Sequence, residues 1–155
     1  LLEVGKNVVF EKGALVFHPE NIKIGNNVYV GHYAILKSYF NGSINIGDNS
    51  WIGQKVFIHG GGNINIGKYV GIGPGVNIIS SFHDYNDSKY IIKNKIIFKK
   101  VNIGNGTDIG VSSTILPGVS IGQNCMIGAG SLVNKNIPSG YLAVGNPIKL
   151  IRKIK

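Results

Sequence analysis

A six-residue period runs through most of this chain and constrains its fold more than any single residue does. From residue 103 the chain reads IGNGTD-IGVSST-ILPGVS-IGQNCM-IGAGSL-VNKNIP, so an aliphatic residue opens every unit. The same pattern occurs earlier, at 24–35, 46–57 and 66–77. A fixed short period indicates one structural unit stacked on copies of itself. We therefore expect a solenoid rather than a single globular core.

The period favours strands over helices. Because six does not match the 3.6 residues of a helical turn, a helix would rotate its apolar face away within two units. Short extended runs separated by turns keep every opening residue inside. Val, Ile and Thr suit such strands, and Gly and Asn suit the turns. Three units would then close one triangular coil of about 18 residues.

The spacing of the glycines that follow an opening residue tests this coil directly. These glycines stand at 5, 25, 47, 67, 104 and 122, with spacings of 20, 22, 20, 37 and 18 residues. The long spacing contains one extra segment, so we predict an extended loop at about 81–100. We predict an all-β solenoid of about six coils in one domain spanning 1–155, with a short C-terminal helix at about 147–154. In that segment Ile148, Ile151 and Ile154 recur every three residues.

Composition agrees with one soluble domain, since the chain is 43% hydrophobic and has no apolar run near the ~20 residues of a membrane-spanning helix. Its single cysteine, Cys125, stands at a position where the repeat uses small residues, so we expect it to fill the core. With no second cysteine there is no internal disulfide, which fits a cytoplasmic protein.

Positive charge is confined to one half of the chain. Residues 1–88 contain six Lys and six acidic residues, whereas residues 89–155 contain nine Lys and Arg152 against Asp108 alone, which accounts for the net charge of +9. Such asymmetry predicts an anionic partner. No nucleic-acid-binding motif is present, so a phosphate-bearing cofactor or peripheral contact with an anionic membrane is the better interpretation. The alternative is that these charges only keep the solenoid soluble.

The hexads and the closing segment IGAGSLVNKNIPSGYLAVGNPIKLIRKI (127–154) together resemble the hexapeptide-repeat acyltransferases, and are closest to the galactoside, maltose and polysaccharide O-acetyltransferases. The resemblance covers almost the whole chain. It implies a left-handed parallel β-helix, a homotrimer, and acetyl-coenzyme A (acetyl-CoA) as acyl donor in the groove between neighbouring subunits.

The resemblance also implies a catalytic base. His83 lies where the regular pattern ends, at the root of the predicted loop, as the general-base His does in the galactoside type. A sugar hydroxyl is a weak nucleophile and needs a base that takes its proton as it attacks. Histidine can take up a proton near neutral pH. From the residues alone, His83 could equally be a structural group bonded to backbone. If it is the base, we expect a loop carbonyl to orient it, in preference to Asp87, with Asp84 pointing away.

Donor contacts follow from the same resemblance. Family members bind the pantetheine arm through backbone groups of the last coils, and one backbone N–H near Gly110–Val111 would stabilise the oxyanion. Basic side chains would meet the phosphates. The positions implied here for coenzyme A are Gly110, Val111, Ala129, Asn134, Lys135 and Arg152.

The residues at the positions that bind the acceptor sugar differ from those of the family. The galactoside type's acceptor-binding Asn and Asp fall on Lys55 and Gly61, and the residues after the base are Asp84 and Tyr85, which we assign to the acceptor.

The other histidines predict no metal site. His18, His32 and His59 are 14 and 27 residues apart, unlike the closely paired zinc ligands of the related γ-type carbonic anhydrases. We expect turn or surface roles for all three, with an acceptor-facing His59 as the alternative.

Together these features predict an acetyltransferase that acts on a hydroxyl of a sugar or surface-polysaccharide precursor. Two alternatives remain: N-acetylation of an amino sugar, free or nucleotide-linked, on the same scaffold, and a solenoid without catalytic activity.

Overall fold

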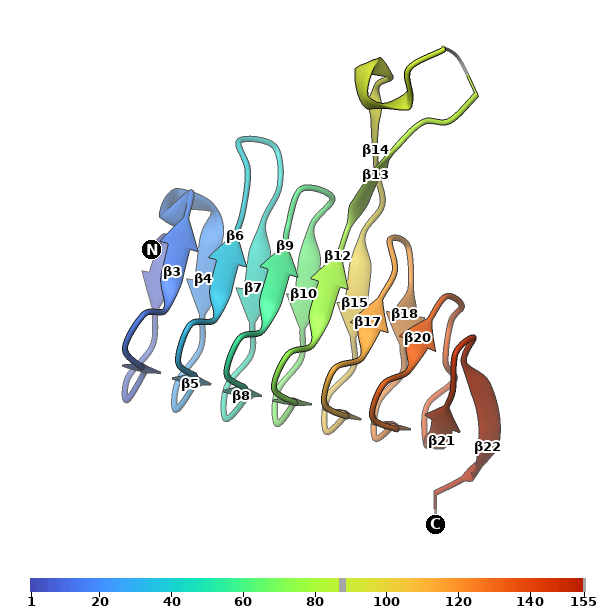
Figure 1. The fold of residues 1–155 in the computed structure, drawn as a ribbon. Helices are drawn as coiled ribbons and strands as arrows, with labels where there is room; N and C mark the ends of the chain where they lie inside the picture. The colour runs from blue at the N-terminus through green and yellow to red at the C-terminus, as the bar shows by residue number, and fades with distance from the viewer. Residues whose placement is uncertain (87–88, 155) are drawn as a thin grey trace.

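The chain folds as a left-handed parallel β-helix, as the repeat and the family resemblance predict. The computed structural model describes residues 1–86 and 89–154. Three sheets form the faces of a prism, and within the coils each strand pairs in parallel with the equivalent strand of the next coil (Figure 1). In the described part of the chain the only helices are two 3₁₀ segments, η1 (Pro19–Asn21) and η2 (Ile91–Lys93), and no helix is long and apolar enough to span a membrane.

The three faces are named here as sheets A, B and C. Sheet A consists of β1 (Glu3–Val4), β4 (Ile22–Ile24), β7 (Ile44–Ile46), β10 (Ile64–Ile66), β15 (Val101–Ile103) and β18 (Ser120–Ile121). Sheet B consists of β2 (Val9–Phe10), β5 (Tyr29–Val30), β8 (Trp51–Ile52), β11 (Gly71–Ile72), β16 (Asp108–Ile109), β19 (Met126–Ile127), β21 (Tyr141–Val144) and β22 (Lys149–Lys153). Sheet C consists of β3 (Leu15–Phe17), β6 (Ile35–Lys37), β9 (Phe57–His59), β12 (Asn77–Ile79), β17 (Thr114–Ile115) and β20 (Leu132–Val133).

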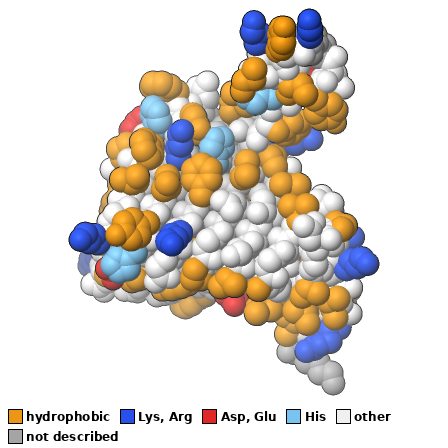
Figure 2. Space-filling view, in the orientation of Figure 1, with side chains coloured by type: hydrophobic (Ala, Val, Ile, Leu, Met, Phe, Trp, Pro, Cys, Tyr) orange, Lys and Arg blue, Asp and Glu red, His pale blue; other side chains and the backbone are white. Residues whose placement is uncertain are grey.

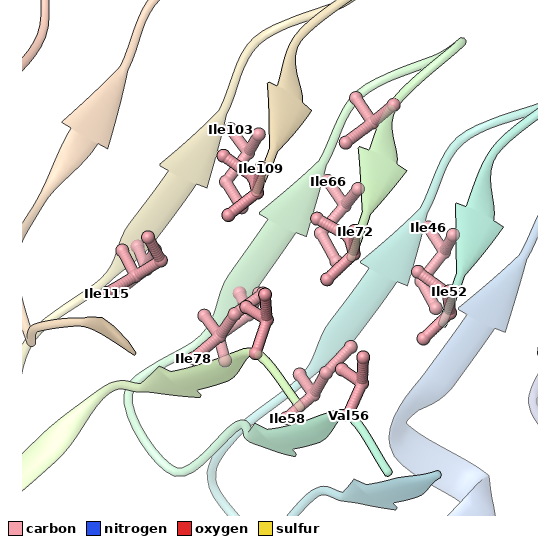
Figure 3. Close-up of a cluster of buried hydrophobic side chains, with 14 of the residues drawn as sticks. Ile46, Ile52, Val56, Ile58, Ile66, Ile72, Ile78, Ile103, Ile109 and Ile115 are labelled. Atoms are coloured by element: carbon pink, nitrogen blue, oxygen red, sulfur yellow. The ribbon is translucent and has the colours of Figure 1, made fainter. Parts of the chain in front are cut away.

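Columns of isoleucine fill the prism (Figure 3). Parallel pairing places Ile66 between Ile46 and Ile103, and equivalent columns run through sheets B and C. The opening residues of the hexads, from Ile24 to Val133, are all at most 3% exposed. Each buried side chain stabilises the fold, because removing apolar surface from water contributes roughly 25 cal/mol of free energy per Å². The columns continue across the long insertion, because Ile64 pairs with Val101 although 37 residues separate them.

Small and β-branched residues occupy the other inward-facing position of the hexads. Cys125 is 2% exposed and packs in the core. The buried hydroxyls of Thr107 and Ser113 donate to the carbonyls of Gly122 and Gly128 in the next coil. A buried hydroxyl costs free energy unless it is hydrogen-bonded, so these bonds make the polar positions of the repeat compatible with the core.

Every insertion leaves the prism at the same edge, where a sheet C strand connects to the next coil. This insertion corner consists of residues 18–21, 38–43, 60–63 and 80–100 (Figure 1). The predicted loop is the longest of the four. It folds as an antiparallel hairpin of β13 (Ser81–His83) and β14 (Ile96–Phe98) that stands out from the prism.

The predicted C-terminal helix is wrong. After a turn at 145–148 the chain forms β22, which pairs antiparallel with β21 and completes sheet B. Ile148 is buried, whereas Leu150 and Ile151 are exposed, so the spacing of the isoleucines does not form one helical face. A segment this short is marginal as a helix, and its β-branched residues suit the open edge that β21 offers. The terminal segment instead pairs with the edge of sheet B that β21 would otherwise leave open.

The structure also has more turns than predicted. Six strands stack in sheet A, and a bridge between Ile121 and Ile137 starts a further turn that β21 and β22 complete. The β-helix therefore has about seven turns rather than about six.

Candidate active site

His83 lies on β13, at the root of the hairpin, as its position in the sequence predicts. Its Nδ1 lies 3.3 Å from the backbone carbonyl oxygen of Asn94 on the opposite arm. A carbonyl can only accept, so this contact places the ring proton on Nδ1 and leaves Nε2 as the basic nitrogen. Nε2 makes no hydrogen bond to any described residue. The orienting group is thus the predicted loop carbonyl.

The hairpin itself holds this carbonyl in place. The Asn94 side chain donates to the carbonyl of Asp84 at 2.6 Å, and the Asp84 N–H donates to the carbonyl of Lys95 at 2.9 Å. The carboxylate of Asp84 accepts from Asn86 and lies 3.7 Å from Lys95 Nζ, so it is engaged away from His83. Asp87, the less favoured orienting group, lies outside the described residues.

A pocket of about 390 Å³ opens between the hairpin root and the edge of sheet C. Four polar side chains line it, those of Tyr39, His59, Ser81 and His83, together with the apolar side chains of Ile79, Phe82, Ile96 and Phe98. Successive side chains of a strand alternate between its faces, so Ser81 and His83 lie on one face of β13. The hairpin projects outward from the insertion corner at the edge of sheet C, and hydrophobic side chains gather over the N-terminal coils of this face (Figure 2).

His59 lies at the centre of a hydrogen-bonded group in this pocket. Its Nε2 lies 2.7 Å from the Tyr39 hydroxyl and its Nδ1 lies 3.4 Å from the Ser81 hydroxyl. Burial, together with the nearby positive charge of Lys37, lowers the pKa of His59 below its ordinary value, so the ring is neutral at physiological pH.

The turn or surface role expected for His59 is therefore wrong, and the alternative that it faces the cleft at the loop root is the one observed. The other two histidines match the expectation. His18 precedes η1 and contacts Glu20, and His32 lies in a turn beside Glu11.

Two adjacent glycines, Gly61 and Gly62, lie against the root of the hairpin. Gly62 donates to the Ser80 hydroxyl at 2.8 Å, and a Cβ on Gly62 would collide with the backbone of Ser80 and Lys99. A Cβ on Gly61 would lie 3.0 Å from the ring of Phe98 and 3.5 Å from that of Tyr39. At this position, where the galactoside type has an acceptor-binding Asp, the two aromatic rings take the space instead.

Three of the predicted coenzyme A positions lie together at another edge, where sheet B connects to sheet C. We call residues 110–113 and 128–131 the B–C corner. Gly110 stacks directly on Ala129, and the Gly130 N–H donates to the Val111 carbonyl at 2.8 Å. The Gly110 N–H is used within the fold, since it donates to Ile127. The N–H groups of Val111 and Ala129 donate to no group in the described part of the chain.

The remaining predicted positions lie elsewhere. Asn134 and Lys135 are exposed in the turn that follows β20, and Arg152 is exposed on β22, where its guanidinium donates to the Lys153 carbonyl. None of the six predicted coenzyme A residues lines the pocket of His83. Asp84 and Tyr85, predicted to bind the acceptor, also lie outside its lining.

Sequence reasoning did not identify Tyr39, Ser81, Phe82 or Phe98 as residues of the site. Ser81 could have been found, because alternation along a short strand places it on the face of His83. Tyr39 could not, since it reaches the pocket from an insertion two coils before the hairpin. Among the described residues, no three His, Cys, Asp or Glu side chains gather where they could hold a metal ion.

Comparison with known protein families and curated proteins gives consistent matches. A model of bacterial transferase hexapeptide repeats (six repeats) matches residues 100–135. Galactoside O-acetyltransferase of Escherichia coli K12 is 34% identical over 128 residues, an alignment that covers 70% of this chain and 63% of that protein. The chain spans less than two thirds of the length of the first curated relatives that it matches.

Solved structures agree over a longer stretch. AntD, an N-acyltransferase from Bacillus cereus in complex with dTDP and 3-hydroxybutyryl-CoA, is 28% identical with a TM-score of 0.89, covering 99% of this chain and 84% of that one. A hexapeptide-repeat acetyltransferase from Vibrio cholerae complexed with acetyl-CoA is 27% identical with a TM-score of 0.74, covering 93% and 72%. These matches and the fold confirm the predicted resemblance to the hexapeptide-repeat acyltransferases.

Proposed function

We propose that this chain, whose repeat and fold are those of the hexapeptide-repeat acyltransferases, transfers an acetyl group from acetyl-CoA to a hydroxyl of a sugar or polysaccharide precursor. The observation that supports it most is the state of His83. Its Nδ1 is held by the Asn94 carbonyl while Nε2 is left without a partner among the described residues, in a pocket large enough for a sugar ring.

In this mechanism His83 is the general base. Its Nε2 takes the proton of the acceptor hydroxyl as that oxygen attacks the thioester carbonyl. A backbone N–H then stabilises the tetrahedral oxyanion, and Val111 supplies it in preference to Gly110, whose N–H is already bonded within the fold. Collapse of the intermediate breaks the C–S bond, and the imidazolium returns the proton to the departing thiolate.

Donor binding supports a site shared between copies of the chain. Val111 and Ala129 offer unbonded N–H groups for the pantetheine amides, and Lys135 and Arg152 offer charge for the phosphates. Because neither set lines the pocket of His83, the donor of one subunit would meet the hairpin of its neighbour in a homotrimer. Sedimentation should give a trimer. A monomer that persists at all concentrations would contradict this arrangement.

N-acylation of a nucleotide-linked amino sugar is the second candidate. It is supported by AntD, one structure of which contains dTDP-4-amino-4,6-dideoxyglucose and coenzyme A and aligns with 99% of this chain. An amine acceptor must also lose a proton, so His83 would act in the same way in both reactions.

A panel of acceptors distinguishes the candidates. Wild-type protein is incubated with acetyl-CoA and neutral sugars, free amino sugars or nucleotide-linked amino sugars, and the released thiol is measured. Release that requires a neutral sugar supports O-acetylation, and release that requires an amino sugar supports the second candidate. Release that no panel member increases, and that is unchanged in His83→Ala, would favour the solenoid without catalytic activity. His32→Ala serves as a control, since His32 lies in a turn at the surface.

A further inference from the structure

Three polar side chains from three different segments meet beside His83. Tyr39 comes from the 38–43 insertion, His59 from β9, and Ser81 from β13. They lie 20 and 22 residues apart in the sequence, so only the stacking of the coils brings them together. His59 lies opposite Lys37 of the preceding coil, and its ring packs edge-on against those of Tyr39 and Phe57.

The chemistry of a neutral imidazole constrains this group. One ring nitrogen is a donor and the other an acceptor. If the Tyr39 hydroxyl donates to Nε2, then Nδ1 carries the proton and donates to the Ser81 oxygen. The Ser81 hydroxyl can then donate to a ligand, and the Tyr39 oxygen can accept from one. In the other tautomer the directions reverse. In either state one hydroxyl can donate to a ligand and the other can accept from it.

We propose that Tyr39, His59 and Ser81 form a relay that presents one hydroxyl donor and one hydroxyl acceptor to a polyhydroxylated acceptor and so sets its position against His83. The proposal rests on the function proposed above, because it assigns the acceptor of that reaction to this pocket. Tyr39 and Ser81 touch the acceptor directly, and His59 is a positioning residue that acts through them.

The rest of the pocket fits such an acceptor. Its walls are apolar, formed by Phe82, Ile96 and Phe98 of the hairpin and by Ile79, and they suit the C–H face of a sugar ring. Adjacent sugar hydroxyls each donate and accept, which complements a donor and an acceptor held a fixed distance apart. A site built to hydrogen-bond a hydroxyl rejects ligands that lack it, so the relay also predicts selectivity for a particular pair of hydroxyls.

The first test measures the relay without turnover. Protein with ¹⁵N-labelled histidine is examined by NMR at neutral pH, and the tautomer of His59 is read from its two ring nitrogens. In wild type we expect a neutral ring, and Tyr39→Phe or Ser81→Ala should each shift its tautomer populations, because each removes one partner. Tyr33→Phe is the matched control, since Tyr33 is exposed in a turn away from the pocket. A His59 signal unchanged by both pocket variants would overturn the relay.

The second test measures positioning. For an acceptor found in the panel, Tyr39→Phe and Ser81→Ala should each raise its KM about fivefold, the worth of one hydrogen bond of about 1 kcal/mol. The KM for acetyl-CoA should not change, and kcat should stay within a few-fold. The double variant should lose less than the product of the two single effects, because both changes interrupt one relay. Unchanged acceptor KM, or independent effects, would overturn the proposal.

The two tests separate this inference from the proposed function. If no panel member is acetylated, the proposed function fails, and methyl glycosides then serve as binding probes in the NMR experiment. Perturbation of the His59 ring signals by a methyl glycoside, lost in Ser81→Ala, would still support a sugar-binding relay. Signals that no methyl glycoside perturbs would overturn it.

Discussion

The interior of the coils and the insertion corner differ in how the sequence repeats. In the interior, each position repeats from coil to coil, so Ile66 has Ile46 on one side and Ile103 on the other. At the insertion corner four segments leave the prism, and their lengths range from four to 21 residues, so the coil-to-coil repeat is interrupted. The repeat provides stability, and the interruption provides chemically diverse side chains. A solenoid can hold a non-repeating site because each coil contacts only its neighbours.

Substitution of an interior isoleucine should have the largest effect on stability. Ile72→Ala, in β11, removes a fully buried side chain between Ile52 and Ile109 and should lower the free energy of unfolding by about 2–5 kcal/mol. Denaturant unfolding measures this loss. At a temperature where the variant remains folded, its kcat should match wild type. A loss of kcat in the folded variant would contradict the claim that the interior contributes stability and only the insertion corner contributes catalytic groups.

Two glycine substitutions compare the corner with a regular turn. Gly62→Ala and Gly104→Ala each insert a Cβ against backbone of the following coil, and each should cost about 1–3 kcal/mol of stability. Only Gly62 supports the hairpin root, so only Gly62→Ala should also reduce kcat, by up to about 100-fold if His83 moves by about 1 Å. Thermal unfolding and steady-state kinetics on both variants make the comparison. Equal kcat in the two variants would contradict the claim that only Gly62 supports the hairpin root.

The basic residues of the last turns should have smaller effects, confined to the donor. Lys135→Ala and Arg152→Ala should each raise the KM for acetyl-CoA several-fold, since an exposed charged contact contributes about 1 kcal/mol. Their kcat should stay close to that of wild type. A loss of kcat with unchanged KM would place these residues in the chemical step instead.

The smallest expected effect is a pH dependence from His59. Its pKa is lowered in the folded state, so below the ordinary value of about 6.5 the unfolded chain binds more protons than the folded one. Wild-type stability should therefore decline as the pH falls below about 6.5, and His59→Gln should show a shallower decline. Unfolding curves at pH 7 and at lower pH measure the difference. If the stability of both proteins declined equally with falling pH, His59 would not be the source of the decline.

Sequence reasoning predicted the interior well and the corner only in part. The hexads determine which residues face inward, because parallel stacking repeats the same environment every coil. The position of His83 at the loop root and its contact with a loop carbonyl were also predictable, since both groups belong to one hairpin. The hydrogen-bond partners of His59 were not predictable, because one comes from a segment one coil before it and the other from a segment one coil after it. The terminal strand was mistaken for a helix because spacing alone cannot show that β21 leaves an edge open.

The central claim is that His83, at the insertion corner, is the base for acetyl transfer while the coils only support it. The most direct measurement is kcat for His83→Ala, with coenzyme A affinity and thermal stability determined on the same preparation. We expect kcat to fall by about 10²–10⁴-fold, the usual contribution of a positioned general base, with affinity and stability unchanged. Wild-type kcat in a folded His83→Ala variant that still binds coenzyme A would contradict the claim.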